Sequence, residues 1–148
     1  SALREMMYQW IDRQEGIDWQ ALSHLYRVAP LGEKSPENLK LAFSNSMFKC
    51  FVFDGDKLIA AGRAVADGID CSYICDVAVL PEYQGQGIGK RIVEKMMALS
   101  KGHKKIILYS YPGREGFYKK FGFKRMTTAM ALFENQIQAS EWGLVSDE

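Results

Sequence analysis

The sequence predicts an α+β fold in which a mixed, mostly antiparallel sheet is flanked by helices. Two observations lead to this fold class. Short apolar segments of strand length follow one another between Asp-Gly turns in the middle of the chain, and amphipathic helix patterns lie before and after them. The chain has 148 residues, of which 47% are hydrophobic, so it can form one core. We therefore expect a single domain over residues 1–148.

The expected order is strand, two helices, three strands, helix, strand, helix and two strands. Asp18 and Ser35 supply caps for the first two helices, and Pro36 favours the first turn of the second. The Asp-Gly turns join the three central strands as hairpins. The predicted strands lie over 6–11, 48–53, 57–66, 73–80 and 105–109, with an extended pair over 124–133.

The segment Asp76–Lys90, DVAVLPEYQGQGIGK, carries the most information about function. An apolar strand leads into a glycine-rich loop, and the loop opens a helix. Glycines expose backbone N–H groups, and the first turn of a helix adds unpaired donors and the positive end of its dipole. This order predicts an anion site for a phosphate or pyrophosphate. The helix after it has one apolar face, made of Ile88, Ile92, Val93, Met96 and Met97.

Two common phosphate loops do not fit the spacing. A P-loop needs Ser or Thr directly after Gly-Lys, but Arg91 follows Lys90. The dinucleotide fingerprint needs glycines at its first, third and sixth positions, and neither Gly85 nor Gly87 starts such a series.

Gln84, Gly87 and Gly89 instead form the pattern Gln-x-x-Gly-x-Gly. This pattern resembles the pyrophosphate loop of the GCN5-related N-acetyltransferases, which bind acetyl-coenzyme A. The valine-rich strand before the loop resembles that family as well. So does Gly116–Phe123, in which a tyrosine precedes a Gly-Phe pair. The expected order of elements is also that of the family's fold, so the resemblance covers most of the chain.

The resemblance implies how acetyl-CoA would be held. The pantetheine arm would pair with the strand backbone at Val77 and Val79, like an added strand. A backbone N–H of Val77 or Ala78 would stabilise the oxyanion of the tetrahedral intermediate. The pyrophosphate would lie on the loop and the helix start, formed by Gln84, Gly85, Gln86, Gly87, Ile88, Gly89 and Lys90.

Tyr118 matches the tyrosine whose hydroxyl, in that family, reaches the departing sulfur. A phenol stays protonated at neutral pH, so it can serve as a general acid. Tyr118 is therefore the predicted catalytic residue and a further acetyl-CoA contact. A covalent acetyl-enzyme on Cys75 is not expected, because no paired histidine is available to activate its thiol.

The general base stays open. Related enzymes often place a glutamate near positions 73–75, where this chain has Tyr-Ile-Cys. Asp76 is the candidate catalytic carboxylate, although strand alternation puts its side chain on the opposite face from Val77. Glu115, Tyr111 and a chain of water molecules are further alternatives.

The predicted function is direct acetyl transfer from acetyl-CoA to a primary amine of a small molecule. Two alternatives stay open: acetylation of a protein N-terminus or lysine, and a non-catalytic CoA-binding module. Aromatic and basic side chains that would suit an amine with an apolar body are Trp19, Tyr26, Arg27, Tyr109, Tyr111 and Arg114.

Composition limits the partners. The 19 basic and 18 acidic residues provide no general field for nucleic acid or an anionic membrane. No apolar run approaches the ~20 residues of a membrane helix. Two distant histidines and three irregularly spaced cysteines predict neither a metal site nor a disulfide framework. We expect a cytoplasmic protein, and a homodimer is an open alternative.

Overall fold

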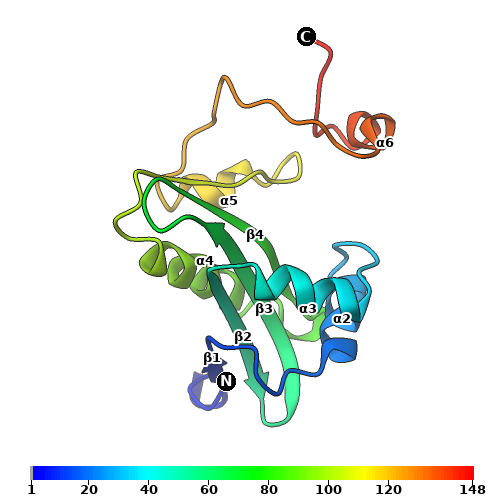
Figure 1. The fold of residues 1–148 in the computed structure, drawn as a ribbon. Helices are drawn as coiled ribbons and strands as arrows, with labels where there is room; N and C mark the ends of the chain where they lie inside the picture. Colours follow the sequence, from blue (N-terminus) through cyan, green and yellow to red (C-terminus); the bar gives the residue numbers. More distant parts are fainter. Residues whose placement is uncertain (1) are drawn as a thin grey trace. The chain divides into compact units, whose positions relative to one another are not determined.

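The computed structural model describes residues 2–148 and confirms the predicted α+β class (Figure 1). Five strands form one sheet in the order β1-β2-β3-β4-β5. Neighbouring strands are antiparallel except β4 and β5, which are parallel. The strands are β1 (Gln9–Ile11), β2 (Phe48–Asp54), β3 (Lys57–Ala66), β4 (Cys71–Val79) and β5 (Lys105–Ile107).

One helix precedes the first strand, and the others lie between and after the strands. They are α1 (Ala2–Glu5), α2 (Trp19–Val28), α3 (Pro36–Ser44), the short 3-10 helix η1 (Pro81–Tyr83), α4 (Ile88–Leu99), α5 (Glu115–Lys119) and α6 (Gln136–Glu141). The chain packs as two compact units, a first unit that ends at Leu108 and a second unit from Tyr109 to Glu148. The first unit contains the whole sheet, and the second contains α5 and α6.

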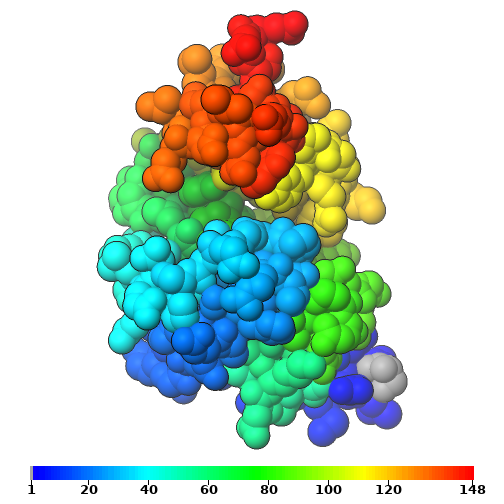
Figure 2. Space-filling view, turned by 90° about the vertical axis from the view of Figure 1, so that its right-hand side faces the viewer, coloured from blue at the N-terminus to red at the C-terminus, as the bar shows by residue number. Residues whose placement is uncertain are grey.

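Helices α2 and α3 cover one face of the sheet, where an aromatic core forms. Phe43 of α3 stacks on Phe51 of β2 with ring centroids 5.2 Å apart, and Trp19 packs edge-on against Phe51. Tyr26 of α2 is completely buried in this layer. In the space-filling view, the residues of α2 and α3, coloured from blue to cyan, form one continuous layer (Figure 2).

Helix α4 covers the opposite face (Figure 1). Of its predicted apolar face, Ile88, Ile92, Val93 and Met96 are buried, and Met97 is half-buried. Two neighbouring residues of β3 show the two faces directly. A Cβ atom on Gly62 would lie 2.6 Å from Ile92 Cγ2 of α4, whereas the guanidinium of Arg63 lies 5.9 Å from the Phe43 ring of α3.

The end of the chain differs from the prediction. Residues 124–133 form no strand, because their sequence KRMTTAMALF contains no Gly, Asn, Asp or Pro to close a hairpin. The apolar side chains of this segment, Met126, Met130 and Leu132, are exposed and pack against no part of the core. The helix α6 follows instead, with the Asn135 side chain accepting from Gln138 N. Asparagine is a favoured cap, so this signal was present in the sequence.

The start of the chain also differs. Residues 2–5 form α1, and the first strand is confined to Gln9–Ile11 rather than 6–11. Within residues 2–148, no helix combines the length and the apolar character needed to cross a bilayer.

Candidate functional site

The glycine-rich loop has the backbone shape that its sequence requires. Gly85 and Gly87 have φ angles of 83° and 81°, in the left-handed region that other residues seldom adopt. A Cβ atom at either position would meet no protein atom within 4 Å. The two glycines are therefore needed for their conformation, and the space around them is open. Gly89 differs, because a Cβ there would make an ordinary contact with Val79 Cγ2 at 3.7 Å.

The N-terminus of α4 offers donors to a ligand. Asp18 caps α2 and Ser35 caps α3 with side-chain oxygens, but Gly87 at the cap of α4 has no side chain to do so. The first backbone hydrogen bond of α4 runs from the N–H of Arg91 to Gly87 O, at 3.1 Å. The N–H groups of residues 88–90 precede it and point out of the helix end. The exposed Lys90 adds a positive charge beside them. This donor set suits an anion such as a pyrophosphate.

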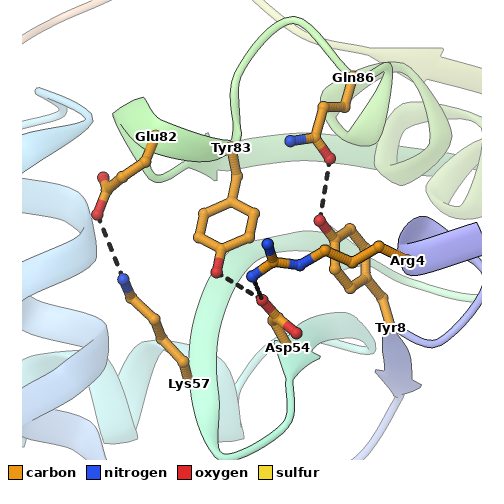
Figure 3. A network of polar contacts seen from close by, with 7 residues as sticks. All are labelled: Arg4, Tyr8, Asp54, Lys57, Glu82, Tyr83 and Gln86. Carbon is orange, nitrogen blue, oxygen red and sulfur yellow. Dashed lines mark hydrogen bonds and ion pairs between the residues drawn. The ribbon is translucent and has the colours of Figure 1, made fainter. Parts of the chain in front are cut away.

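The two glutamines of the loop serve its structure. Gln84 Nε2 donates to Val79 O at 3.0 Å and closes the loop onto the end of β4. Gln86 Oε1 accepts from the hydroxyl of Tyr8 at 3.0 Å (Figure 3). Both side chains are thus engaged within the protein, which leaves the backbone of the loop to meet a ligand.

A polar network supports η1, the segment that leads into the loop (Figure 3). Tyr83 donates to Asp54 Oδ2 at 2.6 Å, and Arg4 contacts the same oxygen at 2.7 Å. The hydrogen bond from Tyr83, followed by that from Arg4, lowers the pKa of Asp54. Lys57 and Glu82 form an ion pair at 3.3 Å nearby. The β2–β3 hairpin and α1 therefore hold the base of the loop.

Strand β4 has an open edge beside the loop. Within the described chain, β5 pairs only with Cys71, Ser72 and Tyr73, so β4 continues to Val79 beyond the end of its neighbour. Val77 and Val79 are partly exposed, and Ala78 is buried. An open strand edge can accept an extended ligand as an added strand. The pairing of a pantetheine arm with Val77 and Val79 at this edge stays a prediction from the sequence.

A β-bulge interrupts β4 at Asp76. Ala61 of β3 faces Ala78, and Arg63 faces Cys75, so the single residue Gly62 opposes both Asp76 and Val77. Asp76 has a φ angle of 54°, the only left-handed angle of a non-glycine residue within the described chain. Bulges of this kind bend a strand and re-aim the groups that follow.

The side chain of Asp76 lies on the α2 and α3 face, as strand alternation predicts. Its Oδ2 accepts from Arg63 Nε at 2.8 Å, and its Oδ1 lies 3.6 Å from Lys34 Nζ. Its carbonyl oxygen accepts from the hydroxyl of Tyr26 at 2.7 Å. Tyr26 is buried, so it lines no open surface for an acceptor amine. The base role of Asp76 stays a prediction, and both of its carboxylate oxygens face cations.

The thiols of Cys50 and Cys75 are poor nucleophiles. Burial raises the pKa of Cys75 to about 11, which the nearby charge of Arg63 only partly opposes. Burial likewise raises the pKa of Cys50 to about 12. A thiol with such a pKa carries almost no thiolate at neutral pH. Among residues 2–148, no three His, Cys, Asp or Glu side chains gather as metal ligands would.

Tyr118 lies on α5 in the second unit. Its ring packs edge-on against Phe117 at 5.0 Å and near Phe123 at 6.3 Å. Partial burial raises the pKa of Tyr118, and the charge of Arg114 opposes this shift. The hydroxyl therefore stays protonated at neutral pH, as a general acid must.

Of the alternative bases, Glu115 already accepts a hydrogen bond within the protein, and Tyr111 is exposed. Glu115 Oε2 accepts from Gly113 N at 2.9 Å, and hydrogen bonds from its own N–H and from Gly113 lower its pKa. Tyr111 is exposed and lies beside Trp142. The loop, the strand edge and Asp76 lie together in the first unit, whereas Tyr118, Glu115 and Tyr111 lie in the second.

Sequence reasoning missed the residues that support the site. The sequence pattern offers Tyr26 as a contact for the acceptor amine and indicates no role for Arg63 or Tyr83. Their roles depend on partners at positions 76 and 54, far away in sequence. A glycine inside the apolar strand β3, at Gly62, was the one local signal of a bulge or a close approach.

The model of the acetyltransferase (GNAT) family matches residues 4–123. The chloroplastic GCN5-related N-acetyltransferase 1 of Arabidopsis thaliana is 40% identical over 114 residues, covering 74% of this chain and 57% of that protein. The chloroplastic serotonin N-acetyltransferase 2 of Oryza sativa subsp. japonica is 30% identical over 114 residues, covering 73% of this chain and 57% of that protein. The chain thus spans little more than half the length of these relatives.

Solved structures share the fold. The GNAT family protein SP0256 from Streptococcus pneumoniae TIGR4 superimposes with a TM-score of 0.74 at 27% identity. The match covers 87% of this chain and 99% of that one.

Proposed function

Because the chain belongs to the acetyltransferase (GNAT) family, we propose that it transfers the acetyl group of acetyl-CoA to a primary amine of a small molecule. The observation that carries this proposal is the uncapped start of α4, with open space at Gly85 and Gly87, beside the open edge of β4. These features fit a ligand with an extended arm joined to a pyrophosphate.

The proposed binding mode follows the donors of the first unit. The N–H groups of residues 85–90 hold the pyrophosphate, with the side chain of Lys90 beside them. The backbone of Val77 and Val79 pairs with the pantetheine arm. The N–H of Val77 or Ala78 faces the acetyl carbonyl, where one such donor is worth roughly 3–4 kcal/mol in the transition state.

The transfer is direct in this proposal. The neutral amine attacks the thioester carbon, a C–N bond forms, and the C–S bond breaks. Tyr118 gives its proton to the departing sulfur, and the amine proton leaves to a base or to solvent. The raised pKa of Cys75, about 11, supports direct transfer because that thiol is protonated and cannot take the acetyl group first.

A small-molecule acceptor is favoured over a protein for two reasons. The nearly even total charge of 19 basic and 18 acidic residues gives no net field to attract a charged peptide. The rice relative is named a serotonin N-acetyltransferase, and serotonin is a primary amine with an aromatic body. We propose an acceptor of that chemical class.

The direct test measures free thiol released from acetyl-CoA in the presence of serotonin, other arylalkylamines, aliphatic amines and peptides with free N-termini or lysines. We expect release that depends on an arylalkylamine, with one acetylated amine formed per thiol. Preference for peptides would favour the protein acetyltransferase alternative. Binding of acetyl-CoA without release in any mixture would favour the non-catalytic module.

A further inference from the structure

The bulge residue Asp76 is held at both its main chain and its side chain. The hydroxyl of Tyr26 donates to its carbonyl oxygen at 2.7 Å, and Arg63 Nε donates to its carboxylate at 2.8 Å. Tyr26 is 0% exposed, and the side chains of Arg63 and Asp76 are 18% and 14% exposed. Because all three groups are largely desolvated, loss of either donor leaves the Asp76 oxygen that it binds without that hydrogen bond in a site with little access to water.

The two donors are themselves fixed by separate elements. Tyr26 lies on α2 within the aromatic layer, so its ring has no freedom to turn away. Arg63 also donates to Ser46 Oγ at 3.2 Å, and that hydroxyl donates to Ala42 O at 2.7 Å. The end of α3 therefore fixes the direction from which Arg63 reaches Asp76.

A third contact completes the arrangement, which we name the Asp76 cluster (Tyr26, Lys34, Arg63 and Asp76). Lys34 lies 3.6 Å from the second carboxylate oxygen, and Ser23 Oγ donates to Lys34 O at 2.6 Å. Lys34 is the more exposed cation, at 29%. With a cation at each oxygen, the carboxylate is placed to hold the bulge rather than to take a proton from an amine.

The cluster stabilises a costly backbone conformation. The left-handed region is unfavourable for a non-glycine residue, and such a conformation persists only where the surroundings impose it. At Asp76 this conformation determines the direction of the peptide groups that follow, including the N–H groups of Val77 and Ala78.

From this geometry we propose that Tyr26 and Arg63 are positioning residues for acetyl transfer. They hold Asp76 in its left-handed conformation, so that the backbone donor after it faces the acetyl carbonyl. The inference rests on the proposed function. It identifies the side chains that orient the backbone N–H group proposed to stabilise the oxyanion.

The main test compares Tyr26→Phe with Ser72→Ala. Tyr26→Phe removes only the hydroxyl that binds Asp76 O. Ser72 provides a matched control on β4, the strand that contains Asp76. Its buried hydroxyl forms a hydrogen bond with Ser100 Oγ at 2.7 Å and does not contact the bulge. Calorimetry measures the affinities for acetyl-CoA and for CoA, and steady-state kinetics measures kcat and KM. Melting temperatures show whether the two variants are similarly destabilised.

We expect Tyr26→Phe to lower kcat by about 10- to 100-fold, the effect of misplacing a reacting group by a fraction of an ångström to 1 Å. The KM for acetyl-CoA should change less than threefold. The affinity for acetyl-CoA should fall relative to that for CoA, since only acetyl-CoA has the carbonyl. Ser72→Ala should keep both the wild-type kcat and the wild-type affinity ratio. A Tyr26→Phe protein whose kcat and affinity ratio match those of Ser72→Ala would overturn the inference.

A second variant separates positioning from base catalysis. Asparagine also tolerates the left-handed region, so Asp76→Asn should retain the bulge but weaken its contacts with Arg63 and Lys34. If Asp76 only holds the bulge, this variant should have a lower kcat, and its kcat/KM profile against pH should keep the wild-type shape. Loss of the acidic limb of that profile would identify Asp76 as the base and refute the positioning role.

Failure of the inference and failure of the proposed function give different results. A wild-type protein that releases no thiol with any amine contradicts the function, and the affinity ratio then still tests the positioning role. A wild-type protein that binds neither acetyl-CoA nor CoA contradicts both. Wild-type transfer that Tyr26→Phe leaves intact contradicts the inference alone.

Discussion

At the residue scale, the same chemical group serves different purposes in different surroundings. The hydroxyl of Tyr83 is bonded to Asp54 beneath the loop, and that of Tyr26 is bonded to a backbone carbonyl. Tyr118 differs because its ring is packed by Phe117 and Phe123 while its pKa is raised by partial burial. These surroundings suit a hydroxyl that keeps its proton until a sulfur accepts it.

Replacing Tyr118 with phenylalanine should therefore reduce turnover more than binding. We expect kcat to fall by roughly 10²-fold, a typical contribution of a general acid, with little change in acetyl-CoA affinity. In the wild-type protein the rate should fall as pH rises through the raised pKa of Tyr118, because the acid is then lost. Single-turnover rates across pH provide the measurement. An unchanged rate and pH profile in Tyr118→Phe would make Tyr118 a packing residue only.

At the element scale, local signals predicted most of the sheet. Asp54-Gly55 and Asp67-Gly68 fixed both hairpins, and β3 lies at its predicted bounds, Lys57–Ala66. The helix α4 followed from the spacing of its apolar residues. The bulge at Asp76 was not predicted, because it depends on the contact of Gly62 with α4 and on hydrogen bonds from α2 and β3.

Gly62 shows how tightly α4 and β3 are packed. A Cβ atom there would lie 2.6 Å from Ile92 Cγ2, so Gly62→Ala should destabilise the fold by about 1–3 kcal/mol through overpacking. Gly89→Ala is the matched control at the same helix, since its Cβ would lie 3.7 Å from Val79. That change should be neutral or stabilising by up to ~1 kcal/mol. Urea unfolding measures both, and equal stabilities for the two variants would show that the close approach at Gly62 is relaxed in solution.

At the scale of the whole molecule, the balance of charge leaves no dominant field, so carboxylates with specific partners should control the response to acid. Hydrogen bonds from the N–H groups of Ile69 and Asp70 lower the pKa of Asp67, and those from Tyr83 and Arg4 lower that of Asp54. A depressed folded-state pKa contributes stability above the unfolded value and loses it as pH falls through the folded value.

The free energy of unfolding should therefore decline as pH falls below 3.8, the ordinary pKa of both groups. The decline should be shallower in Asp67→Asn, which cannot take up the proton. Thermal unfolding between pH 5 and pH 2.5 checks this. Identical slopes in the wild-type and Asp67→Asn proteins would show that the turn at Asp67 plays no part in acid stability.

The central claim is that the start of α4 binds the pyrophosphate of acetyl-CoA, and calorimetry of Gly87→Glu tests it most directly. Gly16→Glu is the matched control, because Gly16 and Gly87 have φ angles of 82° and 81° and both face open space. Each variant imposes the same backbone strain, but only Gly87→Glu places a carboxylate among the loop donors. Acetyl-pantetheine, which lacks the pyrophosphate, provides the matched ligand.

We predict that Gly87→Glu weakens acetyl-CoA binding by at least about tenfold, or ~1.4 kcal/mol, while Gly16→Glu leaves it within twofold of wild type. Acetyl-pantetheine should bind the wild-type and Gly87→Glu proteins equally. Unchanged acetyl-CoA affinity in Gly87→Glu, or an equal loss in Gly16→Glu, would contradict the assignment of the loop.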